Sequence, residues 1–194
     1  LVDTINPTRE AHVITIEDPL EYLHQHKKSV VTQRELYTDT RSYEAALRAA
    51  LREAPDVILL GEMRDAETIK AAVTAAETGH LVISTLHTIG AANTVDRIVD
   101  TFPPEQQRQI RTQLALALEG VVSQQLLAAE GGTLIPAFEV MTVTPAVRNM
   151  IRESKAFQLD SVISTSGALG MITMDQSILE LVRGGRVSQD TALR

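Results

Sequence analysis

The sequence predicts an α/β fold in which a parallel sheet has helices on both faces and a helical subdomain follows. Three short segments are nearly continuous runs of Val, Ile and Leu, at residues 12–19, 56–62 and 80–87. Such runs are typical of strands that are buried on both faces. Helical patterns lie between these segments, and this alternation indicates parallel strands joined by right-handed crossovers.

Two helices are expected between the strands. Residues 42–54 place small and aliphatic side chains on one face, and Glu44 and Arg48 lie one turn apart on another face. Residues 66–78 form the second helical pattern, and Asp65 precedes it as the expected N-cap.

The second half of the chain is expected to be more helical. A long helical pattern runs from Pro104 to about Ala129, and a strand is predicted over residues 133–141. Three more helices are predicted, near 145–153, 155–164 and 173–183, and Thr144-Pro145 suits the start of the first. Because the composition changes near residue 142, we expect a subdomain boundary there, with the sheet-containing portion at 1–141 and a helical subdomain at 142–194.

Composition and charge exclude several classes of protein. There is no apolar run near the ~20 residues that a membrane span needs and no signal-peptide pattern, so we expect a cytoplasmic protein with no transmembrane segment. The absence of cysteine excludes disulfides and thiolate zinc sites. A net charge of −7 and an aromatic fraction of 3% disfavour nucleic acid as a partner.

Ionisable residues end all three buried segments. Glu17 and Asp18 end the first, Glu62 the second, and His87 and Thr88 the third. In open parallel sheets ligands bind outside the carboxyl ends of the strands, so a ligand site is one interpretation. The other is that polar residues here only cap the following helices, and the pattern alone does not decide between them.

The residue types suit phosphate chemistry. The run VILLGE, which ends in Glu62, has the form of a Walker B strand, whose carboxylate holds Mg²⁺ directly or through water. Glu17, on a separate strand, is placed to polarise an attacking water as a general base. His87 is able to donate a hydrogen bond to a γ-phosphate.

The other histidines are assigned different roles. His80 and His87 are separated by an extended strand of roughly 23 Å, so they do not share a metal ion. We expect a packing or interface role for His80. His24 and His26 have no acidic or thiol partner at a characteristic spacing, and a solvated loop is expected there.

Several motifs together resemble the type II/IV secretion ATPase superfamily. ITIEDPLEY resembles its acidic Asp box, LREAPDVILLGEMRD its Walker B region, and TGHLVISTLHT its His box. AVRNMIRE, at residues 146–153, resembles a signature of PilT-type pilus retraction ATPases, and the similarity continues through GMITMDQSILELVRGG. The order and spacing of these motifs make the resemblance specific.

The resemblance implies roles for individual residues. Glu17 matches the catalytic glutamate, Glu62 the Walker B glutamate that holds Mg²⁺, and His87 the histidine that senses the nucleotide. For Arg64 it implies either a phosphate contact or an ion pair that positions the Walker B loop. Implied as well are a RecA-like sheet, ATP and Mg²⁺ as cofactors, and a homo-hexamer. The hexamer would act on pilin subunits at an inner-membrane pilus platform, from the cytoplasmic side.

Residues 146–153 are expected to couple ATP turnover to movement. On a helix Arg148, Asn149 and Arg152 lie on the side opposite the apolar stripe, so they are the candidate coupling residues. The alternative is an amphipathic surface helix with solvated arginines. Replacing both arginines with alanine is expected to separate the two interpretations.

Two features depart from the family pattern. The usual Asp-Pro-Asp before the Walker B strand is Ala54-Pro55-Asp56 here, which reads as a tolerated change. The motif G-x-x-x-x-G-K-[ST] does not occur, and we expect the chain to begin just past that loop and past a PAS-like domain. An assembly or secretion ATPase of the same superfamily and a non-catalytic interaction module are the alternatives.

Overall fold

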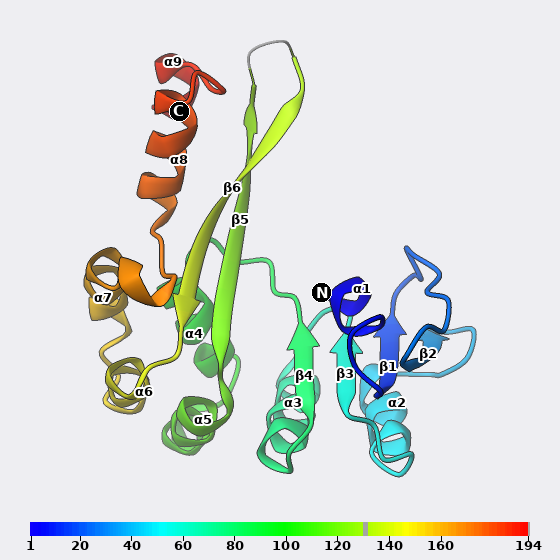
Figure 1. Cartoon of the computed structure of the whole chain (residues 1–194). Helices are drawn as coiled ribbons and strands as arrows, with labels where there is room; N and C mark the ends of the chain where they lie inside the picture. The colour runs from blue at the N-terminus through cyan, green and yellow to red at the C-terminus, as the bar shows by residue number, and fades with distance from the viewer. Residues whose placement is uncertain (130–131, 194) are drawn as a thin grey trace. The chain divides into compact units, whose positions relative to one another are not determined.

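The computed structural model describes residues 1–129 and 132–193 (Figure 1). The chain forms two compact units, Leu1–Leu86 and His87–Arg194. The boundary predicted between residues 141 and 142 falls inside the second unit, so it is not where the compact units divide. The proposed division into an ATPase-core portion and a helical subdomain stays a prediction.

The first unit contains a four-stranded sheet in the order β2-β1-β3-β4, in which every neighbouring pair is parallel. Its strands are β1 His12–Glu17, β2 Val30–Glu35, β3 Val57–Leu60 and β4 Leu81–Ser84, and its helices are α1 Val2–Ile5, α2 Tyr43–Ala50 and α3 Ala66–Glu77. The parallel sheet is confirmed, and β2 is a strand that the sequence pattern did not indicate.

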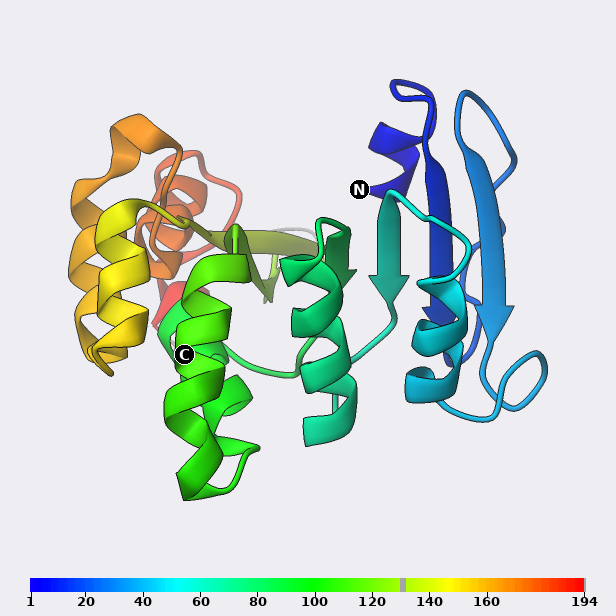
Figure 2. The same ribbon diagram turned by 90° about the horizontal axis from the view of Figure 1, so that it is seen from below.

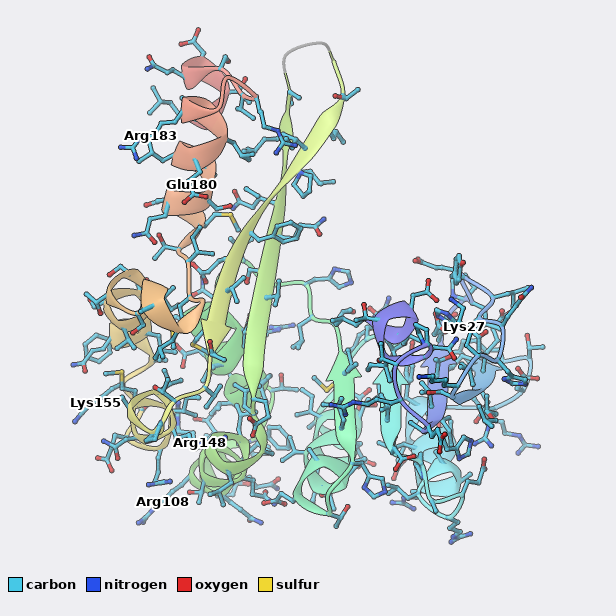
Figure 3. The ribbon with its side chains drawn as sticks, in the orientation of Figure 1. Lys27, Arg108, Arg148, Lys155, Glu180 and Arg183 are labelled. Atoms are coloured by element: carbon cyan, nitrogen blue, oxygen red, sulfur yellow. The ribbon has the colours of Figure 1, made fainter. Side chains whose placement is uncertain are left out.

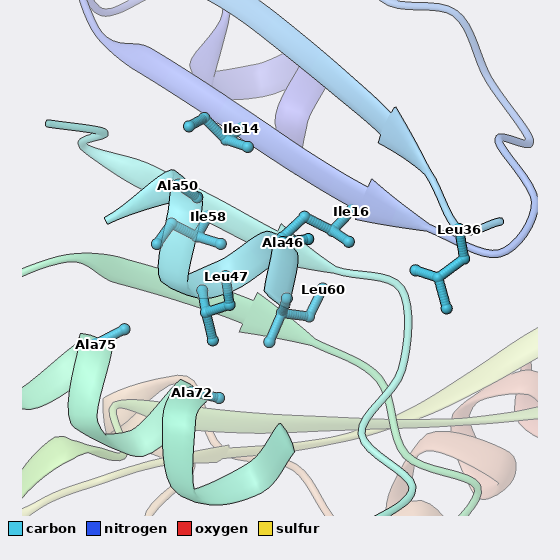
Figure 4. Close-up of a cluster of buried hydrophobic side chains, with 10 residues drawn as sticks. All are labelled: Ile14, Ile16, Leu36, Ala46, Leu47, Ala50, Ile58, Leu60, Ala72 and Ala75. Atoms are coloured by element: carbon cyan, nitrogen blue, oxygen red, sulfur yellow. The ribbon is translucent and has the colours of Figure 1, made fainter. Parts of the chain in front are cut away.

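Each face of this sheet is covered by helices, as predicted. On one face aliphatic residues of β1 and β3, including Ile16 and Leu60, pack against Leu47 of α2 and Ala72 of α3 (Figure 4). On the other face the core contains valines of β1, β2 and β3 together with Val2 of α1. Figure 2 shows α1 on the side of the sheet opposite α2 and α3. The alternation of side chains along each strand supplies both cores.

The helix starts follow their capping residues. The Ser42 hydroxyl accepts a hydrogen bond from Ala45 N at 3.1 Å at the start of α2. Arg48 and Glu44 form the expected ion pair on the exposed side of that helix. The helix ends at Ala50, earlier than predicted, and Ala54 has a φ of 50°, which is incompatible with a helix.

The second unit combines helices with a long hairpin. Its elements are α4 Ala91–Asp100, α5 Pro104–Ala117, β5 Gly120–Ala128, β6 Leu134–Thr142, α6 Pro145–Arg152, η1 Ala156–Gln158, α7 Leu159–Thr165, η2 Gly167–Leu169, α8 Met174–Arg183 and α9 Gln189–Ala192. The helices predicted near 145–153, 155–164 and 173–183 are present, the second of them beginning with the short η1 turn.

The long helix predicted from Pro104 to about Ala129 is wrong in its second half. Helix α5 ends at Ala117, because Leu118 is extended, with a ψ of 130°. Residues from Gly120 onward pair antiparallel with β6 and form a two-stranded ribbon that α8 accompanies (Figure 1). Long-range strand pairing overrides the helical pattern here.

Helix α6 begins as the sequence predicts. The Thr144 hydroxyl accepts a hydrogen bond from Val147 N at 3.3 Å, and Pro145 occupies the first helical position. Val147 and Ile151 are fully buried, and the helix packs against α5. Within residues 1–129 and 132–193, no helix has both the length and the apolar content that crossing a membrane requires.

Candidate functional site

The carboxyl ends of β1 and β3 bring two predicted site residues to one edge of the first unit. Glu17 is the last residue of β1, and Glu62 follows β3 after one glycine. Gly61 N donates a hydrogen bond to Ile16 O at 2.8 Å, which joins the two strand ends. Met63 N then donates to Thr85 O at 3.1 Å beyond the end of β4. Both carboxylates therefore lie at the edge where ligands bind in sheets of this kind.

Gly61 lets these two segments approach each other. A Cβ atom at this position would lie 3.0 Å from the Tyr43 hydroxyl oxygen and 3.3 Å from Glu17 Cα. A side chain would push the Glu62 loop away from β1. The glycine of GEMRD is thus explained by close packing at the site.

Glu17 is oriented by neighbours on its own sheet. Its Oε1 accepts a hydrogen bond from the Thr15 hydroxyl at 2.6 Å and one from Gln33 Nε2 at 3.4 Å. Both hydrogen bonds found for this carboxylate within the described ranges reach Oε1. The side chain is only half-buried, so it is accessible to solvent. This arrangement suits a general base.

Glu62 is buried, with 9% exposed, and forms an ion pair with Arg64. The hydrogen bond and the negative charge from Glu62 raise the pKa of Arg64 above its ordinary value. The ion pair, one of the two roles expected for Arg64, is therefore present. A guanidinium that is 72% exposed contributes little to stability through such a pair, so its significance is the placement of the Glu62 carboxylate.

Asp65 serves the helix that follows. Its Oδ1 accepts from Thr68 N at 2.8 Å and its Oδ2 from the Thr68 hydroxyl at 3.1 Å. This is the predicted N-cap of α3. For this acidic residue, helix capping is the correct interpretation.

Tyr43 is a residue of this edge that the sequence did not indicate. It is the first residue of α2, and its hydroxyl lies beside Gly61. Burial raises the pKa of the Tyr43 hydroxyl, and the negative charges of Glu62 and Asp18 raise it further. The site thus gains a neutral hydroxyl among carboxylates. No sequence pattern marks it, because the tyrosine reads as an ordinary helix residue.

The histidines have separate places. His87 is exposed and is the first residue of the second unit, so its role beside the carboxylates stays a prediction. His80 is half-buried and its Nδ1 lies 2.9 Å from Ala75 O, which agrees with the packing role expected for it.

The loop around His24 and His26 is the exposed loop that was predicted, and both histidines also make contacts within it or beside it. His26 Nδ1 accepts a hydrogen bond from Val31 N at 3.0 Å, and His24 Nδ1 lies 3.4 Å from Asp3 Oδ1. The loop is therefore tied to β2 and α1. Val31 is five residues from His26, whereas Asp3 is distant from His24 in sequence, so local patterns do not indicate the second contact.

The sheet edge that carries Glu17 and Glu62 is better suited to Mg²⁺ than to a metal whose ligands all come from the protein. Within the described ranges, no three His, Cys, Asp or Glu side chains are arranged to hold a metal ion together. Mg²⁺ commonly binds one or two carboxylates and takes its remaining ligands from water and substrate phosphates. Glu62 offers such a carboxylate at the rim of the sheet.

Arg148 makes contacts that the sequence did not indicate. Its Nη1 donates to Ala115 O at 2.8 Å and Leu116 O at 2.7 Å, and its Nη2 donates to Glu119 Oε1 at 2.8 Å. These contacts satisfy carbonyl groups at the C-terminal end of α5, so Arg148 has a structural role there. Asn149 and Arg152 are exposed, as predicted.

Comparison with known proteins agrees with this geometry. A profile of the type II/IV secretion system protein family matches residues 1–131. The chain is 51% identical over 192 residues to the type IV pilus retractation ATPase PilT of Pseudomonas aeruginosa. It is 53% identical over 195 residues to a twitching motility protein of Neisseria gonorrhoeae. The matches cover 99% and 100% of this chain but 56% and 52% of the relatives, so the chain spans about half their length.

Solved structures match the fold. A crystal structure titled as the pilus retraction motor PilT with bound ADP superimposes with a TM-score of 0.92 at 49% identity, covering 99% of this chain and 54% of that one. The ATPase DotB of Legionella pneumophila gives 0.85 at 28% identity, covering 95% and 51%. The fold is therefore the α/β RecA-like fold of secretion ATPases. The chain belongs to the type II/IV secretion system protein family and is of the PilT type within it.

Proposed function

We propose that the full-length gene product is an ATP-driven motor that retracts type IV pili and so drives twitching motility. The observation that carries this proposal is the 51% identity to a pilus retractation ATPase over 99% of the chain. The placement of Glu17 and Glu62 at one sheet edge supports it, because ATP hydrolysis needs a base and a metal-binding carboxylate in the same place.

The residues of the edge have separate roles in this proposal. Glu17, held at Oε1 by Thr15 and Gln33, accepts the proton of the attacking water. Glu62 holds Mg²⁺ through water, and the metal when bound offsets the charge of the ATP phosphates. His87 contacts the γ-phosphate and senses its presence. Arg64 keeps the Glu62 carboxylate in place.

The phosphate-binding loop is missing from the 194 residues, since they contain no G-x-x-x-x-G-K-[ST]. Without its backbone N–H groups and lysine, Glu17, Asp18 and Glu62 repel a free nucleotide. We therefore expect the 194-residue chain to hydrolyse no ATP and to bind Mg²⁺-ATP with a Kd above about 1 mM. Isothermal titration measures this directly. Micromolar binding would instead point to another phosphate site, for which the loop at residues 166–170 is the candidate.

The proposed oligomeric assembly rests on the same similarity to PilT-type ATPases. The motor is a homo-hexamer at the cytoplasmic side of the inner membrane, where it acts on the pilus platform and pilin subunits. Arg148, Asn149 and Arg152 of α6 are the candidate coupling residues of this proposal, and Asn149 and Arg152 are the exposed ones. Nucleic acid has no role in it.

Deleting the gene and counting surface pili tests the proposal against its two alternatives. A retraction motor leaves cells with more pili than wild type and no twitching, and the full-length product hydrolyses ATP. An assembly ATPase leaves cells without pili. A non-catalytic interaction module shows no ATP hydrolysis in the purified full-length product.

A further inference from the structure

Glu139 is a buried carboxylate outside the site described above. It lies on β6 with 6% of its surface exposed. Its Oε1 accepts a hydrogen bond from Ala91 N at 2.7 Å, and its Oε2 accepts one from Met174 N at 3.4 Å. A buried carboxylate is costly unless it is hydrogen-bonded, and here each oxygen has a backbone donor.

The two donors are the first residues of two helices. Ala91 begins α4 and Met174 begins α8, and the N–H groups of a first turn have no partner within their own helix. The positive ends of both helices favour the negative charge of the carboxylate. Gly90, the N-cap of α4, has no capping side chain and has a φ of 85°, so Glu139 supplies the acceptor that a capping residue normally provides.

Further hydrogen bonds extend this junction on each side. Val140 and Ile172 exchange two backbone hydrogen bonds, of 2.9 and 3.1 Å, so the segment before α8 pairs with β6. On the other side the Thr94 hydroxyl donates to Gly90 O at 2.8 Å and lies 2.7 Å from the Thr88 hydroxyl. Thr88 directly follows His87 in the sequence. The turn after His87 and the start of α8 therefore meet at one carboxylate.

We propose that Glu139 is a positioning residue that links the turn at residues 87–90 to helix α8, so that a displacement of one is passed to the other. Glutamate is needed because the link takes two acceptor oxygens. A glutamine retains one oxygen, and its amide nitrogen donates rather than accepts. The meaning of the link for ATP turnover rests on the proposed function, whereas the link itself does not.

A coupling experiment on the full-length product tests the link. Thr173 caps α8 through its hydroxyl, which accepts from Gln176 N at 3.2 Å, so Thr173→Ala loosens the start of that helix. We expect Thr173→Ala to raise amide hydrogen exchange at Ala91 severalfold, although Ala91 is in another helix. In a Glu139→Gln background, where Ala91 exchange is already about tenfold faster, the added effect falls below about twofold.

Glu180→Gln is the matched control, because it removes the same charge from the exposed side of α8 (Figure 3). It leaves Ala91 exchange and the Thr173→Ala effect unchanged. Equal effects of Thr173→Ala in both backgrounds, or no effect on Ala91 in the wild-type background, would overturn the proposal. The second outcome needs only Thr173→Ala, so it stays decisive if Glu139→Gln does not fold.

A kinetic measurement on the full-length product then asks whether the link serves turnover. Glu139→Gln should lower kcat at least fivefold with little change in the KM for ATP, and Glu180→Gln should change neither. An unchanged kcat would overturn a role in turnover. A wild-type protein without ATPase activity would overturn the proposed function instead, and the exchange experiment would still decide the link.

Discussion

Glu17 and Glu139 are both glutamates of β-strands, but their surroundings differ. Glu17 ends β1, is half-buried, and receives its hydrogen bonds at one oxygen from side chains of the same sheet. Glu139 lies inside β6, is 6% exposed, and gives each oxygen to the start of a different helix. Among the described residues, the proposed general base accepts hydrogen bonds at one oxygen only, whereas both oxygens of Glu139 accept from backbone N–H groups and so join two helices. The number of free acceptor oxygens separates the two roles better than burial alone.

The largest effect is expected for Glu17, the proposed general base. In the full-length product, Glu17→Gln should lower ATP turnover by about 100-fold or more, because an amide does not accept the proton of the attacking water. Binding of ATP, measured by titration, should stay within about threefold of wild type. Glu21→Gln, in the exposed loop after β1, is the control and should change neither quantity. Turnover within about tenfold of wild type would remove Glu17 from the general-base role.

Glu62 is expected to give a smaller effect. If its carboxylate holds Mg²⁺ through water, Glu62→Gln should raise the Mg²⁺ concentration for half-maximal ATPase activity by about 10- to 100-fold. Glu67→Gln, at an exposed position of α3, should leave that concentration unchanged. An unaltered magnesium dependence in Glu62→Gln would assign this carboxylate to the ion pair with Arg64 only.

The two arginines of α6 differ in the same way as the two glutamates, since within the part of the chain that the structure describes only one of them is hydrogen-bonded to the backbone of another helix. Arg148 donates to the end of α5, so Arg148→Ala should lower the free energy of unfolding by about 1–3 kcal/mol in urea titrations. Arg152 is exposed, and Arg152→Ala should change the free energy of unfolding by less than about 0.5 kcal/mol. The same variant should impair pilus retraction while ATP turnover stays normal. Equal stability losses would contradict the structural role of Arg148. Normal retraction in Arg152→Ala would remove that residue from coupling.

The smallest effect concerns Tyr43 and pH. Because its pKa is raised in the folded state, its ionisation favours the unfolded chain, where tyrosine titrates near pH 10. The contribution to stability is present below about pH 10 and is lost as the pH rises above it. Between pH 9 and 11, thermal unfolding should therefore shift less in Tyr43→Phe than in wild type. Tyr37→Phe, at a side chain that is 79% exposed, is the control and should follow wild type.

The sequence predicted the elements whose signal is local. The strands β1, β3 and β4 are aliphatic runs, and the caps Asp65 and Thr144 lie next to the helices that they begin. Strand β2 was missed because it is an edge strand whose sequence, VVTQRE, is half polar. Strand β5 was read as helix because its strand conformation depends on pairing with β6, which the local pattern does not indicate.

The same distinction applies to the site. Glu17 and Glu62 were predicted because strand ends are visible in the sequence, and both lie at one edge of the sheet. Tyr43 and Glu139 were not, since their surroundings depend on tertiary contacts. The hydrogen bond between Glu139 and Ala91, for example, spans 48 positions. The contacts of Arg148 were not predicted for the same reason, because the carbonyl groups that it contacts belong to another helix.

The most direct measurement of the central claim compares Glu17→Gln and Glu139→Gln of the full-length product in one experiment, by ATP turnover and thermal unfolding. The account predicts that Glu17→Gln loses turnover about 100-fold while its Tm stays within about 2 °C of wild type. Glu139→Gln should lower Tm by about 4–10 °C, since it loses a charge-assisted hydrogen bond worth about 1.5–3 kcal/mol. A Glu17→Gln protein that is destabilised yet active, beside a Glu139→Gln protein with unchanged Tm, would contradict the account.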